Sequence, residues 1–277
     1  MDASRAGASA WSRLQAAFLD LVPIGLLTVA AAVRPARLPV LGLLILGTVI
    51  GGPSHSRRAA VWAGALPVGV SLAWGLVPLP DEAREGSTCA SPTAPFATYR
   101  LAEAILALGA VAVLARGSGR GGEELGLRVP GRRSTALGLM AFGFCGPLGL
   151  LVGPAVAAPF FGDIKIAAGD PMAIVPALVF AVSNGVMEEV IYRGSLRAWT
   201  GRITGPWPAI VGQAIVFGVA HSGPDFTGSA IPVAAAMFAG GLVAGLIVER
   251  TGSLFVPIMI HVGLDIPLYY GNACRVS

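Results

Sequence analysis

The sequence predicts an all-α fold, a polytopic transmembrane helical bundle with about eight to nine membrane segments. Of its 277 residues, 55% are hydrophobic and only 12% are charged, whereas an ordinary soluble domain carries roughly 25% charged residues. Its mean hydropathy is +0.74. Apolar stretches of about 20 residues recur, each long enough to cross a hydrocarbon core of about 30 Å. These charges are too few to make the solvated surface of a soluble protein of this length.

Apolar stretches separated by charged and turn-forming residues predict nine candidate membrane segments. They cover residues 16–33, 38–52, 59–78, 101–115, 135–160, 171–190, 206–221, 231–249 and 253–270. The second and fourth are short for a full span, and they could tilt little, re-enter or merge with a neighbour. We expect three parts: N-terminal membrane helices over residues 1–115, a cytoplasmic linker over 116–134 and a membrane core over 135–277.

The loops between these segments differ in charge, and the difference predicts a topology. Residues 80–99 are acidic and rich in Pro, Ser and Thr, whereas residues 116–134 carry five Arg against two Glu. Because cytoplasmic loops carry an excess of Arg and Lys, we expect a multi-pass protein of the cell membrane with a cytoplasmic N-terminus and an external 80–99 loop. Arg34 and Arg37 then fall outside, against the rule.

Composition also argues against several classes of site. No basic run is interleaved with aromatics as a nucleic-acid groove requires, so we expect no nucleic acid as a partner. The three cysteines form no CxxC pair, and no zinc or redox motif is readable. Cys145 lies in an apolar run. Cys89 and Cys274 would both face the outside and could pair there, or both could be unpaired and incidental.

Ionisable residues inside membrane segments are the most informative feature, because each costs roughly 2.5–3.5 kcal/mol on insertion scales. They are Asp20, Glu103, Glu188, Glu189, His221, Glu249, His261 and Asp265. Asp20, Glu103 and Glu249 lie near segment ends and are expected at the membrane interface. The other five fall in the last hundred residues. His55, in a polar loop, is expected to be solvated.

Glu188 and Glu189 follow a long apolar run. Neighbours on an α-helix point about 100° apart, so we expect that the two acids do not face one partner. Glu189 and Arg193 are four residues apart and share a face, which predicts an ion pair and leaves Glu188 as the unpaired acid. The alternative is that both acids lie at the helix end without a role, since Arg193 and Arg197 place the water boundary close.

Two histidines lie in later apolar segments. His221 is four residues after Phe217, and His261 is four residues before Asp265, so each pair shares a helix face. Either histidine could be a packing residue, and a His–Asp pair could be purely structural. Converging with the paired acids, they would make a polar site able to bind water or a metal. No HExxH spacing is present, so a zincin site is not supported.

Convergence has one geometric condition. Glu188 lies near the cytoplasmic end of its segment, whereas His221 lies about 15 residues into its own, roughly 20 Å along the membrane normal if both helices are straight. The turn over residues 193–205 must therefore protrude, and the helix that begins at Pro206 must start well beyond Glu188.

Three motifs in this order resemble the CPBP intramembrane proteases, also called the CAAX-protease or ABI family. "EEVIYR" at 188–193 matches EExxxR, "FGVAH" at 217–221 matches FxxxH, and "HVGLD" at 261–265 matches HxxxN/D. "EELGLRVP" at 123–130 is similar to the linker before the core of such proteins. The resemblance covers roughly 123–270 and leaves the first hundred residues uncovered. The family includes the Ras-converting CAAX endopeptidase and many bacterial members, some tied to bacteriocin self-immunity.

The resemblance implies a bacterial intramembrane glutamic endopeptidase that works without metal or cofactor on a peptide or membrane-protein substrate. Glu188 and His221 would activate a water, His261 and Asp265 would stabilise the oxyanion, and Arg193 would pair with Glu189. An ionised Asp265 cannot donate a hydrogen bond, so it is either protonated or only orients His261. A non-catalytic scaffold or immunity protein and, less favoured, a small transporter remain alternatives. The oligomeric state and the substrate sequence stay open.

Overall fold

The computed structural model describes residues 10–51, 57–79, 90–91, 93–119, 121–161, 173–222 and 230–273. All regular structure in these ranges is helical, which confirms the predicted all-α class. The helices are α1 (Ala10–Ala32), η2 (Arg34–Ala36), α2 (Arg37–Gly51), α3 (Arg57–Trp74), α4 (Pro95–Gly117), α5 (Arg132–Phe161), α6 (Ile174–Glu188), η6 (Glu189–Leu196), α7 (Arg197–Thr204), α8 (Pro206–Ala220), α9 (Ala230–Thr251) and α10 (Phe255–Ala273).

Each of the nine predicted segments overlaps a helix. Three helices in the described ranges are long and apolar enough to cross a membrane, namely Pro95–Gly117, Ile174–Thr204 and Ile231–Thr251. Shorter apolar helices occur in α1, α3, α8 and α10. These helices indicate a membrane protein. The count of eight to nine membrane segments, the orientation of the N-terminus and the three-part division stay predictions.

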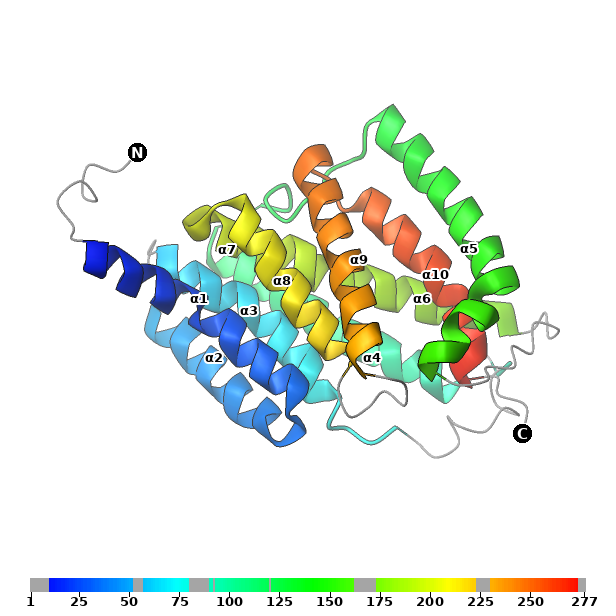
Figure 1. Cartoon of the computed structure of the whole chain (residues 1–277), viewed down its shortest axis with the longest axis horizontal. Helices are drawn as coiled ribbons and strands as arrows, with labels where there is room; N and C mark the ends of the chain where they lie inside the picture. Colours follow the sequence, from blue (N-terminus) through cyan, green and yellow to red (C-terminus); the bar gives the residue numbers. More distant parts are fainter. Residues whose placement is uncertain are drawn as a thin grey trace.

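The helices are arranged around α6 and its continuation η6. Figure 1 shows α1, α2 and α3 gathered at one end of the molecule and α5 and α10 at the other. Helix α6 packs against α4 and α10, η6 packs against α3, and α8 packs against α1 and α9. The apolar core follows this arrangement, with completely buried side chains at Leu27, Leu44, Ile191, Leu196 and Trp199. The last turn of α6 and the whole of η6 therefore lie inside the protein, whereas Leu178 and Val182 earlier on α6 are exposed.

The sixth predicted segment ends too early. It was expected to stop at residue 190, but α6, η6 and α7 form one helix over Ile174–Thr204. The arginine that suggested a water boundary, Arg193, is only 1% exposed, so the helix has no reason to end there. It ends instead at Gly205, whose φ of +85° is a backbone conformation that glycine adopts without strain. Pro206 then begins α8, at the position where a missing N–H costs nothing.

This longer helix satisfies the geometric condition for convergence. Gly205 lies 17 residues after Glu188 (205 − 188) and 16 residues before His221 (221 − 205). Two antiparallel helices of nearly equal length from a common turn bring their far ends to the same level. The protruding turn predicted over 193–205 is therefore an extension of the helix itself.

Helix α4 also differs from the prediction. The fourth segment was expected to be short, over 101–115, yet α4 runs over the 23 residues from Pro95 to Gly117. Pro95 stands at its first turn, where proline favours helix initiation. The possible pairing of Cys89 with Cys274 and the solvation of His55 concern residues outside the described ranges.

Candidate active site

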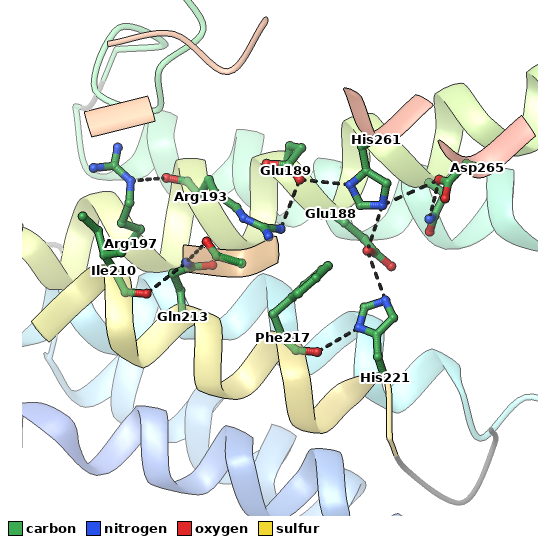
Figure 2. A network of polar contacts seen from close by, with 12 residues as sticks. Glu188, Glu189, Arg193, Arg197, Ile210, Gln213, Phe217, His221, His261 and Asp265 are labelled. Atoms are coloured by element: carbon green, nitrogen blue, oxygen red, sulfur yellow. Dashed lines mark hydrogen bonds and ion pairs between the residues drawn. The ribbon is translucent and has the colours of Figure 1, made fainter. Parts of the chain in front are cut away.

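The two glutamates, two histidines and one aspartate singled out in the three motifs come together where α6, η6, α8 and α10 meet (Figure 2). Glu188 ends α6, Glu189 begins η6, His221 follows α8, and His261 and Asp265 lie on α10. Each helix contributes groups that are four residues apart, or adjacent, in the sequence. The tertiary packing of α10 and α8 against the long helix joins these separate faces into one cluster.

Glu188 lies between the two histidines. Its Oε2 atom is 3.6 Å from Nε2 of His221 and 3.5 Å from Nε2 of His261. Figure 2 shows the carboxylate with one imidazole on either side. Glu188 is buried. Within the described residues Oε2 has no hydrogen-bond partner, as expected for the acid that Arg193 does not pair with. Two imidazoles from other helices face it instead.

Glu189 lies on the other side of the same imidazole. Its Oε1 atom accepts a hydrogen bond from Nδ1 of His261 at 2.9 Å. The prediction that two neighbouring acids do not face one partner is wrong here. Imidazole presents two nitrogens on different sides of the ring, so it can meet both carboxylates. The helix also changes to a π-helix at Glu189. A π-helix has a wider turn, so the angle between successive side chains is smaller than in an α-helix.

Arg193 pairs with Glu189 as predicted, at 3.1 Å between Nη1 and Oε1. The guanidinium carbon also lies 4.1 Å from the centre of the Phe217 ring, a cation–π arrangement. The alternative that these groups lie at a water boundary is not supported, because Arg193 and Glu189 are only 1% and 2% exposed in their side chains. The pair lies within η6, and the contact of Arg193 with the Phe217 ring joins it to α8.

Phe217 fixes the position of His221. The two rings are 4.3 Å apart between centroids, and Nδ1 of His221 lies 2.8 Å from the backbone oxygen of Phe217. A carbonyl oxygen can only accept, so Nδ1 carries the hydrogen and donates it. In neutral His221 the other nitrogen, Nε2, then holds a lone pair directed at Glu188. The FxxxH spacing thus sets both the ring plane and the tautomer.

Asp265 is held by a residue that sequence reasoning missed. Its Oδ2 atom is 3.7 Å from Nε2 of His261 and accepts a hydrogen bond of 2.8 Å from Nδ2 of Asn184. Asn184 is buried on α6, one turn before Glu188. A search for ionisable groups passes over a neutral amide, although its spacing from Glu188 places it on the same helix face.

A second missed residue comes from the N-terminal helices. Arg100 on α4 forms an ion pair with Glu103 at 2.6 Å, and Glu103 also accepts a hydrogen bond from Ser71 on α3. Glu103, expected at the interface, is buried and paired inside the protein. The part of the chain not covered by the resemblance therefore packs α4, with the ion pair of the buried Glu103, against α6, the helix that carries Glu188.

The other two acids expected at the interface differ from one another. Asp20 is buried. Glu249 has a 42% exposed side chain and pairs with Arg197 at 2.7 Å. Its exposure accords with a position at the end of its helix, next to Arg250.

Gly185 allows α10 to approach the site closely. A Cβ atom at this position would meet Val262 at 3.0 Å and the Cβ of His261 at 3.4 Å. No side chain therefore separates α6 from α10 where His261 enters the cluster. This contact explains why a glycine stands three residues before Glu188.

Comparison with known proteins agrees with the resemblance. Residues 170–266 match the family model described as "Type II CAAX prenyl endopeptidase Rce1-like". No curated protein and no solved structure matches the chain. The matched stretch contains all three motifs and every residue of the cluster except those from α3 and α4. The chain thus carries, at residues 170–266, an Rce1-like domain of the CPBP family of CAAX-type intramembrane proteases.

Proposed function

We propose that the protein is an intramembrane, glutamate-dependent endopeptidase that hydrolyses a peptide bond with a water activated by Glu188 and His221. The observation that carries this proposal is the convergence of two Nε2 atoms, from His221 and His261, on one carboxylate oxygen of Glu188. A buried acid with two imidazoles is suited to proton transfer and is costly as a purely structural element.

Glu188 and His221 offer two acceptors to one water. Because Nδ1 of His221 donates to Phe217, its Nε2 is an acceptor. A water that donates one hydrogen to this nitrogen and the other to Glu188 keeps its oxygen lone pairs for attack on a carbonyl carbon. Glu188 takes a proton as the oxygen–carbon bond forms and later delivers it to the leaving amine.

His261 is arranged for the opposite task, donation. Its Nδ1 donates to Glu189, whose charge is balanced by Arg193. Its Nε2 faces Glu188 and Asp265 at 3.5 and 3.7 Å. Three carboxylates around one imidazole favour the form that carries hydrogen on both nitrogens. The Nε2–H group can then donate to the oxyanion of the tetrahedral intermediate, with Asp265 orienting the ring and not itself donating.

Further parts of the proposal concern the setting of this chemistry. The N-terminus lies in the cytoplasm, the protein crosses the membrane several times, the reaction needs no metal, and the substrate is a peptide or a membrane protein. The scaffold, immunity and transporter alternatives use the same fold without hydrolysis. No described contact favours them over the peptidase.

A peptide-library cleavage assay on purified protein in detergent tests the activity, with products identified by mass spectrometry. We expect the wild type to cut and Glu188→Ala and His221→Ala to lose cutting while remaining folded. Addition of a chelator should leave the rate unchanged. Cleavage that survives both substitutions would contradict the proposed roles. Biological function that persists in both variants, with no cleavage by any of the three proteins, would establish the scaffold.

A further inference from the structure

Asn184 lies outside all three motifs, yet it joins the cluster directly. It is 3% exposed, and its amide donates a 2.8 Å hydrogen bond to Oδ2 of Asp265. It stands on α6 one turn before Glu188, so a single helix face carries both the amide and the carboxylate. The uncharged Asn184 side chain binds no proton in the reaction. It can, however, fix the position of Asp265, which faces the imidazole of His261.

The contact matters because two carboxylates compete for one hydrogen of His261. Oε2 of Glu188 and Oδ2 of Asp265 lie 3.5 and 3.7 Å from the same Nε2 atom. If Asp265 moved toward the imidazole and captured the Nε2–H group, that hydrogen would be lost to the oxyanion. Asn184 opposes this movement, because it binds the very oxygen of Asp265 that faces His261.

We infer that Asn184 is a positioning residue of the active site, which tethers Asp265 so that the Nε2–H group of His261 stays directed at the space it shares with Glu188. This role rests on the proposed peptidase activity. It also explains how a chain with Asp at the last position of the HxxxN/D motif can work. In a chain with Asn at that position, the motif residue carries an amide itself. Here Asp265 has none, and Asn184 supplies the buried amide donor. A purely structural Asn184 would instead satisfy a buried carboxylate and affect only folding.

Two substitutions separate these roles. Asn184→Leu removes the donor and keeps the branching and the number of heavy atoms of the side chain. Asn184→Asp places two carboxylates against each other, and such a pair shares one proton at low pH. The shared proton restores a donor to Asp265 and with it the tether. Gln213→Leu is the matched control, because Gln213 is also a completely buried amide but donates to the backbone oxygens of Ile210 and Gly241 on α8 and α9.

The experiment measures kcat and KM for peptide cleavage by folded, detergent-purified full-length protein between about pH 5.5 and pH 8.5, where the shared proton of Asn184→Asp is bound and lost. At about pH 8.5 we expect kcat to fall at least about tenfold in both Asn184 variants, with KM within about twofold, as for a group that acts in the transition state. The ratio of Asn184→Asp to wild-type kcat should rise as the pH falls. The ratio for Asn184→Leu should stay flat, and Gln213→Leu should keep wild-type kcat.

Several results would overturn the inference. Wild-type kcat in Asn184→Leu at any pH, or in Asn184→Asp at about pH 8.5, would do so. A fall no larger than that of Gln213→Leu, or a flat ratio for Asn184→Asp, would do so as well. If Asn184→Leu does not fold, Asn184→Ser against Asn184→Ala replaces it, and equal rates in that pair would count against a donor role. Glu188→Gln is assayed alongside. Full activity in Glu188→Gln, or no cleavage by wild type, would mean that the peptidase proposal itself fails, whereas an inactive Glu188→Gln with a fully active Asn184→Asp would refute only the role of Asn184.

Discussion

Two arginines of the same continuous helix each pair with an acid at the same distance but in opposite surroundings. Arg193 and Glu189, in the middle of Ile174–Thr204, are 3.1 Å apart and 1% and 2% exposed. Arg202, near the end of that helix, is also 3.1 Å from Glu124, but the two side chains are 52% and 41% exposed. Distance alone therefore says little about what an ion pair does.

The difference between the pairs is one of desolvation. An exposed pair exchanges water for a partner and contributes about 0–1 kcal/mol. A buried pair costs free energy to assemble and is weak evidence for stability, but breaking it leaves a charge without solvent. The Glu189 carboxylate also binds His261. The inner pair is therefore best understood as the support that keeps His261 in position, whereas the outer pair joins the linker to the helix end.

Removal of Arg193 should have the largest effect on stability. Arg193→Leu leaves Glu189 buried without its ion-pair partner, so we expect a loss of about 3–5 kcal/mol in the free energy of unfolding. Cleavage should be lost as well, because Glu189 no longer holds its position against His261. Thermal and denaturant unfolding in detergent measure the change. A stability within about 1 kcal/mol of wild type, the range of an exposed pair, would show that the inner pair behaves like the outer one.

A methyl group at Gly185 should have an intermediate effect. The Cβ atom of Gly185→Ala would lie 3.0 Å from Val262 and 3.2 Å from its backbone nitrogen, so α10 must shift. Overpacking of this kind costs about 1–3 kcal/mol, and the shift also moves His261. We therefore expect the cleavage rate to fall more than stability does. Gly109→Ala, on α4 with no atom within 4 Å of the new Cβ, is the matched control. It should keep the wild-type cleavage rate and gain at most about 0.5–1 kcal/mol of stability, because alanine favours a helix interior over glycine.

The smallest effect is expected at the outer pair. Arg202→Ala should change the free energy of unfolding by about 0–1 kcal/mol, less at high salt, because both partners are largely solvated. The cleavage rate should not change. A loss comparable to that of Arg193→Leu would remove the contrast between the two ends of the helix and would assign the linker contact a larger role.

Much of the site was predictable because charge is expensive in an apolar chain. The cost of each ionisable residue singled out Glu188, Glu189, His221, His261 and Asp265, and helix spacing predicted the Glu189–Arg193 pair. The same reasoning failed where a tertiary partner removes the cost. An arginine in an apolar chain suggests nearby water, but Phe217 and Glu189 cover Arg193 on the inside of the protein. The predicted sixth segment is therefore shorter than the helix.

The remaining errors concern features without a local signal. The change to a π-helix at Glu189 depends on packing around η6, and no residue type marks it. Asn184 is neutral, and Arg100 lies close to the predicted start of its segment, so neither stood out. Asn184 acts through a contact between helices far apart in the sequence, which spacing along one helix does not reveal.

The most direct measurement compares Glu188→Gln with Glu189→Gln in the same preparation, by kcat and by thermal unfolding. If Glu188 is the base, Glu188→Gln should lower kcat by about 10²–10⁴-fold and leave the unfolding temperature near that of wild type. Glu189→Gln should lower the unfolding temperature, because Arg193 is left buried without an anionic partner. Wild-type cleavage by Glu188→Gln, or a loss of stability there equal to that of Glu189→Gln, would contradict the assignment of chemistry to the first acid and support to the second.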